Sequence, residues 1–301
     1  MTSERLAGQA DRQLPQGDEI FLDHVGHFAA DPQAARAGLA RAGFAPTPVS
    51  IQVNPDPLGG EPKPSGTSNV TAMFSRGYIE VLFKAADTPL GRQLDAARAR
   101  YDGLHLAAFA AADTRTALRR LARIFHMQPL VEMQRPVDTE HGPGIAAFTI
   151  ARPEVGQMPE GRIQMLTHRT EGTVWQTRWL AHPNGATGLA WLTIAVADVK
   201  EAAERFSRFT GRPAQPSEDG QVIALDRGRV ELVTPEAFAR AFPELPMPSL
   251  PFMGACGIVV DSLDAAERVL RNGGIALRRR GDELVAQFPP ELGKGAWVFF
   301  E

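Results

Sequence analysis

The chain has 301 residues, of which 44% are hydrophobic and 22% are charged, and its formal net charge is −3. This composition is typical of a globular protein, and the length allows two domains. The slightly acidic balance gives no electrostatic reason to expect nucleic acid as a partner, and no apolar run approaches the roughly 18 residues of a membrane span. The single cysteine, Cys256, excludes an intrachain disulfide and a thiolate-rich metal cage. We expect a cytoplasmic protein with neither nucleic acid nor a membrane as partner.

One pattern, an apolar strand followed by an amphipathic helix and about three further strands, occurs four times. The copies begin near Leu22, Gly103, Gly188 and Phe252. Spacings of this size indicate a repeated architectural unit. A single unit would leave one face of its sheet bare, so each must pair with another to bury that face.

Helix signals mark the four copies. Asp31 can cap the first helix, with Pro32 at its first position, and the second helix begins at Asp113 or Thr114. The third helix ends at Gly211 and the fourth at residues 272–274, an Asn-Gly-Gly run. Strands are predicted between the helices at residues 70–74, 78–83, 146–150, 162–166, 222–225, 230–233, 284–288 and 296–300.

The remaining segments suggest the domain limits. Residues 1–19 are polar and predict a disordered tail. Residues 45–66 hold six prolines, too many for a regular element, whereas residues 89–101 predict an extra helix. We therefore expect a first paired domain at 20–170 that carries the site, a linker at 171–187, and a second paired domain at 188–301.

Several motifs resemble those of the vicinal oxygen chelate superfamily. Leu22-Asp23-His24-Val25 followed by Asp31 resembles its opening strand, and Gly77-Tyr78-Ile79-Glu80 resembles its closing strand. More narrowly, Gly66-Thr67-Ser68-Asn69, and Trp175 followed by His182-Pro183-Asn184-Gly185-Ala186, resemble the glyoxalase-like domain group. The resemblance spans about residues 20 to 301. It implies an α+β fold in which four βαβββ modules pair into two curved mixed sheets, as in the glyoxalase, bleomycin resistance and dihydroxybiphenyl dioxygenase-like proteins.

The resemblance also implies a metal centre in the first half. In the superfamily a divalent ion such as Zn, Ni, Mn or Fe is commonly held by His or Gln of each first strand and Glu of each last strand. Here His24 and Glu80 take these positions in the first module, and Gln164 replaces the second Glu. Counting back from Asp113 places Leu106, not His105, at the second histidine position, so His105 is a ligand only if a register shift restores it.

The second half matches the pattern poorly. Its third module has Trp191 at the first position and Glu231 at the last, and its fourth has Ala255 and Val298. Extradiol-type dioxygenases of the superfamily need two His and one Glu in their catalytic half, which these residues cannot supply. We therefore interpret this half as a structural or interface half. Asn69, Gln164 and His168 are candidates for substrate binding in the first half. Glu80, if buried without an ion, should have a raised pKa and could act as a general base.

Two functions stay open. The first is a metal-dependent lyase or isomerase of glyoxalase type that acts on a small oxygen-rich substrate through an enolate-type intermediate. The second is a metal-free module of the same fold that binds or sequesters a small molecule, which the apolar Leu106, Trp191 and Ala255 at ligand positions favour. Four modules in one chain allow a monomer, and homodimers are common on base rates, so both oligomeric states remain open.

Overall fold

The computed structural model describes residues 12–56 and 58–301 of the chain. Its first half contains two strand–helix–strand units. The first comprises β1 (Ile20–Phe28), α1 (Pro32–Arg41), β2 (Ser50–Asn54), β3 (Lys63–Met73) and β4 (Tyr78–Lys84). The helix α2 (Pro89–Arg98) leads to the second, with β5 (Gly103–Ala111), α3 (Thr114–Leu121), β6 (Val131–Thr139), β7 (Gly142–Ala151) and β8 (Arg162–His168).

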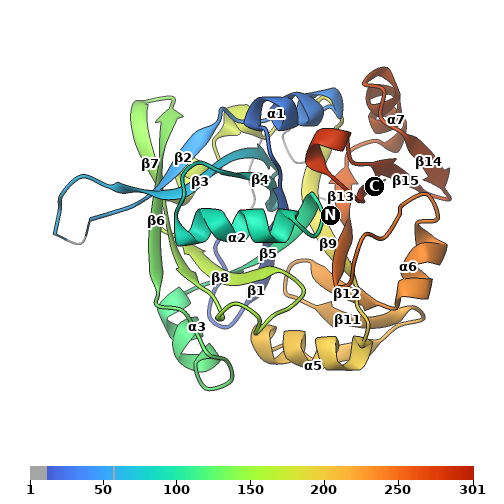
Figure 1. Ribbon diagram of the computed structural model, residues 1–301. Helices are drawn as coiled ribbons and strands as arrows, with labels where there is room; N and C mark the ends of the chain where they lie inside the picture. Colours follow the sequence, from blue (N-terminus) through green and yellow to red (C-terminus); the bar gives the residue numbers. More distant parts are fainter. Residues whose placement is uncertain (1–11, 57) are drawn as a thin grey trace.

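These strands close into a barrel, drawn in blue to yellow-green in Figure 1. The order β1-β4-β3-β2-β6-β7-β8-β5 returns to β1, because β1 pairs antiparallel with β5 and β2 meets β6 at Val53 and Gln134. The α2 helix lies across the barrel, and its Leu90 and Leu94 pack with the inward-facing Leu82. Because alternate side chains point inward, the barrel has an interior that can hold a site.

The second half is an open curved sheet, drawn in yellow to red. Its third unit has β9 (Ala186–Ala195), α5 (Val199–Thr210), β10 (Ala214–Pro216), β11 (Gly220–Ala224) and β12 (Arg229–Val233), and α6 (Pro235–Ala241) follows. The fourth unit has β13 (Phe252–Val260), α7 (Leu263–Asn272), β14 (Leu277–Arg280), β15 (Glu283–Gln287) and β16 (Ala296–Phe300). β9 pairs antiparallel with β13, and Phe238 of α6 packs in the hollow of the sheet against Phe252.

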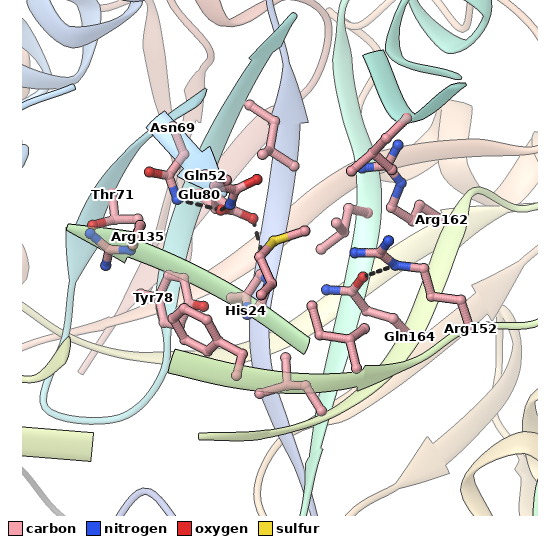
Figure 2. Close-up of a pocket in the computed structure, with 17 residues that line it drawn as sticks. His24, Gln52, Asn69, Thr71, Tyr78, Glu80, Arg135, Arg152, Arg162 and Gln164 are labelled. Carbon is pink, nitrogen blue, oxygen red and sulfur yellow. Dashed lines mark hydrogen bonds and ion pairs between the residues drawn. The ribbon is translucent and has the colours of Figure 1, made fainter. Parts of the chain in front are cut away.

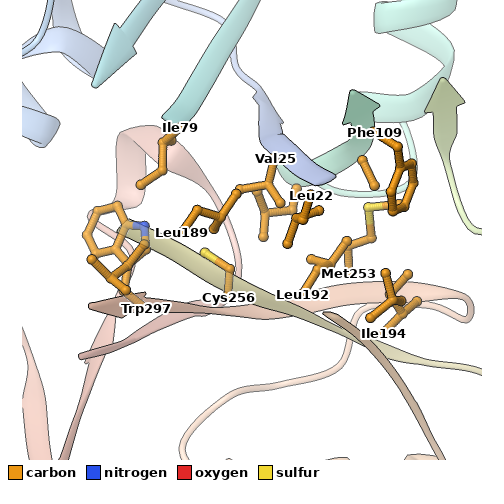
Figure 3. Close-up of a cluster of buried hydrophobic side chains, with 14 of the residues drawn as sticks. Leu22, Val25, Ile79, Phe109, Leu189, Leu192, Ile194, Met253, Cys256 and Trp297 are labelled. Atoms are coloured by element: carbon orange, nitrogen blue, oxygen red, sulfur yellow. The ribbon is translucent and has the colours of Figure 1, made fainter. Parts of the chain in front are cut away.

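An interface of buried apolar side chains joins the two halves (Figure 3). Apolar side chains from the outer face of the barrel meet those of β9, β13 and β16, and all of them are almost fully buried: Leu22, Val25, Ile79, Phe109, Leu192, Met253, Cys256 and Trp297. Burying one such side chain contributes about 1.5–3 kcal/mol. The second half thus supports the barrel strands that carry His24 and Glu80 on their other face.

The predicted fold class is confirmed, and module pairing occurs within one chain, since β1 pairs with β5 and β9 with β13. The prediction of no regular element at 45–66 is wrong. β2 contains none of the six prolines, and only Pro64 enters β3, at its second residue. Proline is tolerated at the start of a strand, so the composition of the segment concealed the strand between the prolines.

The predicted tail lies partly outside the described residues, which begin at Arg12. Residues 12–19 pack on the barrel, unlike the disordered tail expected there, because Nε2 of the buried Gln13 donates to the Ser75 carbonyl at 2.6 Å. Residues 171–187 are also packed, with α4 (Glu171–Val174) and the short 3-10 turn η1 (Thr177–Trp179). In the described part of the chain no helix is long and apolar enough to cross a membrane.

Candidate functional site

A small cavity lies inside the barrel (Figure 2). Its volume is about 30 Å³, room for about two water molecules. Polar and charged side chains dominate two of its walls: His24, Gln52, Asn69, Tyr78 and Glu80 from the first module, and Arg135, Arg152, Arg162 and Gln164 from the second. Thr71 and a set of apolar side chains complete the lining: Leu82, Leu90, Leu106, Met133, Phe148, Ile150 and Leu166. The barrel therefore encloses a polar site under an apolar cover.

A β-bulge places Asp23 and His24 in contact. Leu22 pairs with Phe109 and His24 with Ala108, so Asp23 is an extra residue in β1. Asp23 Oδ1 lies 2.6 Å from His24 Nδ1, and Asp23 Oδ2 lies 2.9 Å from His168 Nε2. All three side chains are buried. His168, predicted as a substrate-binding residue at the rim, thus lies behind the cavity wall and holds Asp23.

The charges of this cluster stabilise each other. Burial alone would lower the pKa of His24, but hydrogen bonds to Asp23 and Glu80 outweigh it and raise that pKa to about 9. Burial would raise the pKa of Asp23, but His168 and His24 hold it far below its ordinary value. At neutral pH His24 is therefore an imidazolium beside an ionised Asp23.

Glu80 lies across the cavity from the second module. Its Oε1 accepts hydrogen bonds from Asn69 Nδ2 at 2.6 Å and Gln52 Nε2 at 3.2 Å, and its Oε2 lies 3.5 Å from His24 Nε2. Burial raises the pKa of Glu80, but His24, Asn69 and Arg135 lower it more, so the net shift is downward. The expected rise is thus wrong: positive groups around the carboxylate outweigh its desolvation.

Three guanidinium groups face this carboxylate from the second module. Arg135 and Arg152 are 6% and 7% exposed, and Arg162 is half-buried. Burial lowers the pKa of each, and the charge of Glu80 acts on all three in the opposite direction. Among the described residues none of the three forms an ion pair, and Arg152 has one side-chain hydrogen bond, from Nε to Gln164 Oε1 at 2.7 Å. The cavity thus carries unpaired cationic groups.

The Tyr78 side chain adds a further donor. Its ring stacks on His24 with centroids 4.3 Å apart. Burial, with Asp23 and Glu80 nearby, raises the pKa of Tyr78 well above its ordinary value, so the phenol stays protonated. In residues 12–56 and 58–301 the Tyr78 hydroxyl has no hydrogen-bond partner, and it is available to a ligand.

The residues present do not fit the divalent ion that the resemblance implies. His24 and Glu80 are two convergent donors, but Gln164 offers its carboxamide oxygen to Arg152. Protein sites for such ions have three or four ligands. No group of three or more His, Cys, Asp or Glu side chains arranged to hold an ion exists in the described chain. Three guanidiniums around the two donors also repel a dication.

The pairing register of β5 and β8 explains why the second module places no histidine in the cavity. Leu106 pairs with Arg162 and Ala108 with Gln164, just as Gly26 pairs with Glu80, so Leu106 occupies the position equivalent to His24. His105 points to the other face of β5, where its ring stacks on Tyr101 and its Nε2 lies 2.7 Å from the Tyr101 carbonyl. No register shift brings His105 into the cavity.

The second half also has a hollow, of about 370 Å³, but no histidine lines it. Glu231 accepts hydrogen bonds from Thr193 and Arg229, and Trp191 stacks under Arg229 with 4.4 Å from its Cζ to the ring centroid. Ala255 and Val298 lie in an apolar cluster with the aromatic side chains of α6. Unlike the arginines of the barrel cavity, the two that line this hollow are ion-paired, Arg229 with Glu231 and Arg280 with Glu283.

The sequence interpretation missed the arginines. Arg135 lies two residues after Met133 on β6, so strand alternation places both on the inner face. Arg152 directly follows β7, and Arg162 opens β8. An arginine is usually solvent-exposed. The available signal was the position of Arg162, which opens the predicted strand 162–166 two residues before Gln164 and therefore shares its face.

The paired modules and the barrel define a vicinal oxygen chelate fold. A family model described as "Glyoxalase-like domain" matches residues 22–210, and the chain belongs to that family. A search of curated proteins finds no match.

Solved structures share the fold at low identity. A hypothetical protein from Staphylococcus aureus is 8% identical with a TM-score of 0.64, covering 93% of this chain and 98% of that one. A mutant of 4-hydroxymandelate synthase from Streptomyces coelicolor is 14% identical with a TM-score of 0.57, covering 93% of this chain and 92% of that one. At such identities the likeness describes the fold alone.

Proposed function

We propose that the first half of the chain, residues 20–170, binds a small organic anion in the barrel cavity without a divalent ion, and that residues 188–301 form a supporting half. The observation that carries this proposal is the set of three guanidiniums, of Arg135, Arg152 and Arg162, that line one cavity without an ion pair among the described residues. Such groups are the usual partners of carboxylates and phosphates.

The charges in and behind the cavity are unbalanced. Four positive groups, the three arginines and His24, meet two carboxylates, Glu80 and Asp23, which leaves an excess of two positive charges. Removing a charge from water costs several kcal/mol unless it is paired. An anion placed against Arg152 and Arg162, which lie on the same side of the cavity (Figure 2), would offset this cost, so its binding would also stabilise the fold.

The pKa shifts favour binding over proton transfer. A general acid or base works best when its pKa lies near the operating pH. The pKa of Glu80 is lowered and that of His24 is raised to about 9, so both side chains keep their charges at neutral pH. Because their charges are fixed at neutral pH, His24 and Glu80 are suited to orienting a ligand rather than to exchanging a proton with it.

The ligand class follows from the donors. The planar fork of a guanidinium matches a carboxylate, and the Tyr78 hydroxyl supplies a further hydrogen bond. The cavity volume limits the enclosed group to about the size of two waters, which suits a single carboxylate. We propose that this binding takes place in the cytoplasm. All the cavity residues come from one chain, so either a monomer or a homodimer could bind the ligand.

A second candidate, the metal-dependent enzyme with an enolate-type intermediate, rests on His24 Nε2 and Glu80 Oε2, which lie 3.5 Å apart. Two ligands on one ion can lie at such a separation. The candidate needs at least one more donor, and Gln164 would have to leave Arg152 to provide it.

A thermal-shift screen separates the two. Formate, acetate and phosphate are added to metal-free protein, each against its potassium chloride control at equal ionic strength. Our proposal predicts a rise in Tm with a carboxylate that Arg152→Gln abolishes. A rise that occurs only with Zn²⁺, Ni²⁺, Mn²⁺ or Fe²⁺, and that His24→Ala abolishes, would favour the enzyme instead.

A further inference from the structure

We propose that a second hollow beside the barrel, here called the outer pocket, binds the apolar body of the ligand whose carboxylate lies on Arg152 and Arg162. This inference rests on the proposed function and names its substrate class, a monocarboxylic acid with an aromatic or branched apolar group. The outer pocket is bounded by α2, the start of β5 and the β7–β8 loop, with Phe28, Ala96, Ala97, His105, Pro153 and Met158 among its lining residues.

The two hollows differ in size in a way that divides a ligand between them. The outer pocket has a volume of about 320 Å³, within the range of pockets that hold small organic molecules. The barrel cavity has about 30 Å³. A carboxylate fits the small hollow, whereas a ring or branched chain needs the volume of the large one.

Arg152 and Arg162 belong to the walls of both hollows. The Arg162 guanidinium lies over the Phe28 ring, with 4.9 Å from Cζ to the ring centroid. Its Nη2 is 3.4 Å from Gln93 Oε1 of α2. An acid held by these two arginines therefore has its carboxylate at the boundary and its next carbon atoms beside Phe28.

The remaining lining suits an apolar body. Ala97, Pro153 and Met158 offer only carbon and sulfur atoms. The charged groups that line the pocket are Arg100 just after α2, Arg152 and Glu154 between β7 and β8, and Arg162 at the start of β8. Arg100 donates to the Pro251 carbonyl at 2.6 Å. Positive charge therefore exceeds negative charge here too, which favours an anion over a cation.

One buried polar atom lacks a partner at this pocket. His105 is 1% exposed, and its Nε2 lies 2.7 Å from a backbone carbonyl, which fixes the proton on that nitrogen. Its Nδ1 has no hydrogen-bond partner among the described residues. A hydroxyl or amide N–H on the ligand body would satisfy this acceptor, because an unpaired buried polar atom is costly.

The test compares the binding of two acids and one amide to variants with a substitution in or just after α2. Binding of formate, phenylacetate and the neutral phenylacetamide to the full chain is followed by ¹H–¹⁵N correlation spectra. The probed variant is Ala96→Trp, whose new ring fills the outer pocket from an exposed position of α2. The matched control is Ala99→Trp, an exposed alanine just after the same helix that is not part of the lining.

We expect phenylacetate to bind at least tenfold more tightly than formate, because a buried ring adds apolar contact, and phenylacetamide to bind weakly. Ala96→Trp should weaken phenylacetate at least tenfold and leave formate unchanged, and Ala99→Trp should change neither. Formate binding with no preference for phenylacetate, or equal phenylacetate binding by both variants, would overturn this inference and leave the proposed function intact. Failure of both acids to bind would overturn both.

Discussion

The Nε of Arg152 donates a hydrogen bond to Oε1 of Gln164 at 2.7 Å, inside the barrel cavity. The residue that replaces a carboxylate ligand in the superfamily pattern thus holds a guanidinium in place. Because the partner is a neutral carboxamide, the Arg152 guanidinium keeps its positive charge without an anionic partner among the described residues. The hydrogen bond between Arg152 and Gln164 therefore accounts both for the incomplete set of metal ligands and for the excess positive charge in the cavity.

Restoring the carboxylate should therefore oppose ligand binding. Gln164→Glu would pair with Arg152 and cancel one positive charge, so the affinity for acetate should fall by about tenfold. The free energy of unfolding should not fall, because the new ion pair replaces an unpaired charge. Isothermal titration and urea unfolding measure the two quantities, and Gln164→Met, which adds no charge, is the control. Tighter acetate binding by Gln164→Glu would contradict the charge argument.

Metal binding should be absent at stoichiometric level. Equilibrium dialysis of the purified chain against Zn²⁺, Ni²⁺, Mn²⁺ and Fe²⁺ should leave less than one ion per chain at micromolar concentration, because His24 and Glu80 alone form an incomplete set. His24→Ala should not change the amount. One tightly held ion per chain that disappears in His24→Ala would show that our donor count is wrong.

The imidazole of His182 should be important for stability. It lies in the motif 182–186, where Nδ1 accepts from Ala45 N at 2.9 Å and Nε2 donates to the Met73 carbonyl at 2.7 Å. His182→Ala leaves two backbone groups without partners and should cost about 2–4 kcal/mol. The exposed His126→Ala should change the free energy of unfolding by less than about 0.5 kcal/mol. If urea unfolding shows that both substitutions change the free energy of unfolding equally, His182 does not have this stabilising role.

The alkaline limb of the stability profile should depend on His24. Its pKa is raised from 6.5 to about 9, so its charge stabilises the fold fully below pH 6.5, and this contribution is lost as the pH rises through 9. The free energy of unfolding should therefore fall between pH 7 and 9.5, and less so in His24→Gln. An identical slope in both proteins, measured by urea unfolding, would contradict the imidazolium assignment.

The acid limb should have another origin. Burial lowers the pKa of His27, His105 and His182 to about 4, so these rings are neutral in the fold but protonate in the unfolded chain below pH 6.5. Stability should then fall as the pH drops from 6.5 to 4, and the lowered pKa of Glu80 extends the loss at lower pH. A maximum near pH 6.5 is expected. A profile that rises towards pH 4 would rule out neutral buried histidines.

Local signals predicted the fold well. Asp31 caps α1 with Pro32 at its first position, and Asp113 caps α3, as predicted. The helix caps depend on neighbours in sequence, so the chain alone reveals them. The pairing of His24 with Glu80 was expected from the resemblance to the superfamily, and the structure places His24 Nε2 3.5 Å from Glu80 Oε2.

The chemistry of the cavity depends on long-range contacts that the sequence does not display. Arg135 and Arg152 come from strands of the second module and meet Glu80 of the first only after the barrel closes. The direction of the Glu80 pKa shift follows from that closure. A resemblance built on metal-ligand positions draws attention to His24 and Glu80 but carries no information about the arginines opposite them.

The most direct test of an anion site in the barrel is the arginine Nε–Hε region of a ¹H–¹⁵N spectrum during titration with acetate. Arg152 Nε is hydrogen-bonded inside the cavity, so its signal reports on occupancy. We predict a saturable shift of the Arg152 signal with one acetate per chain, lost in Arg162→Gln and kept in the exposed control Arg123→Gln. An Arg152 signal that does not respond to acetate, or a shift that Arg162→Gln leaves unchanged, would contradict the account.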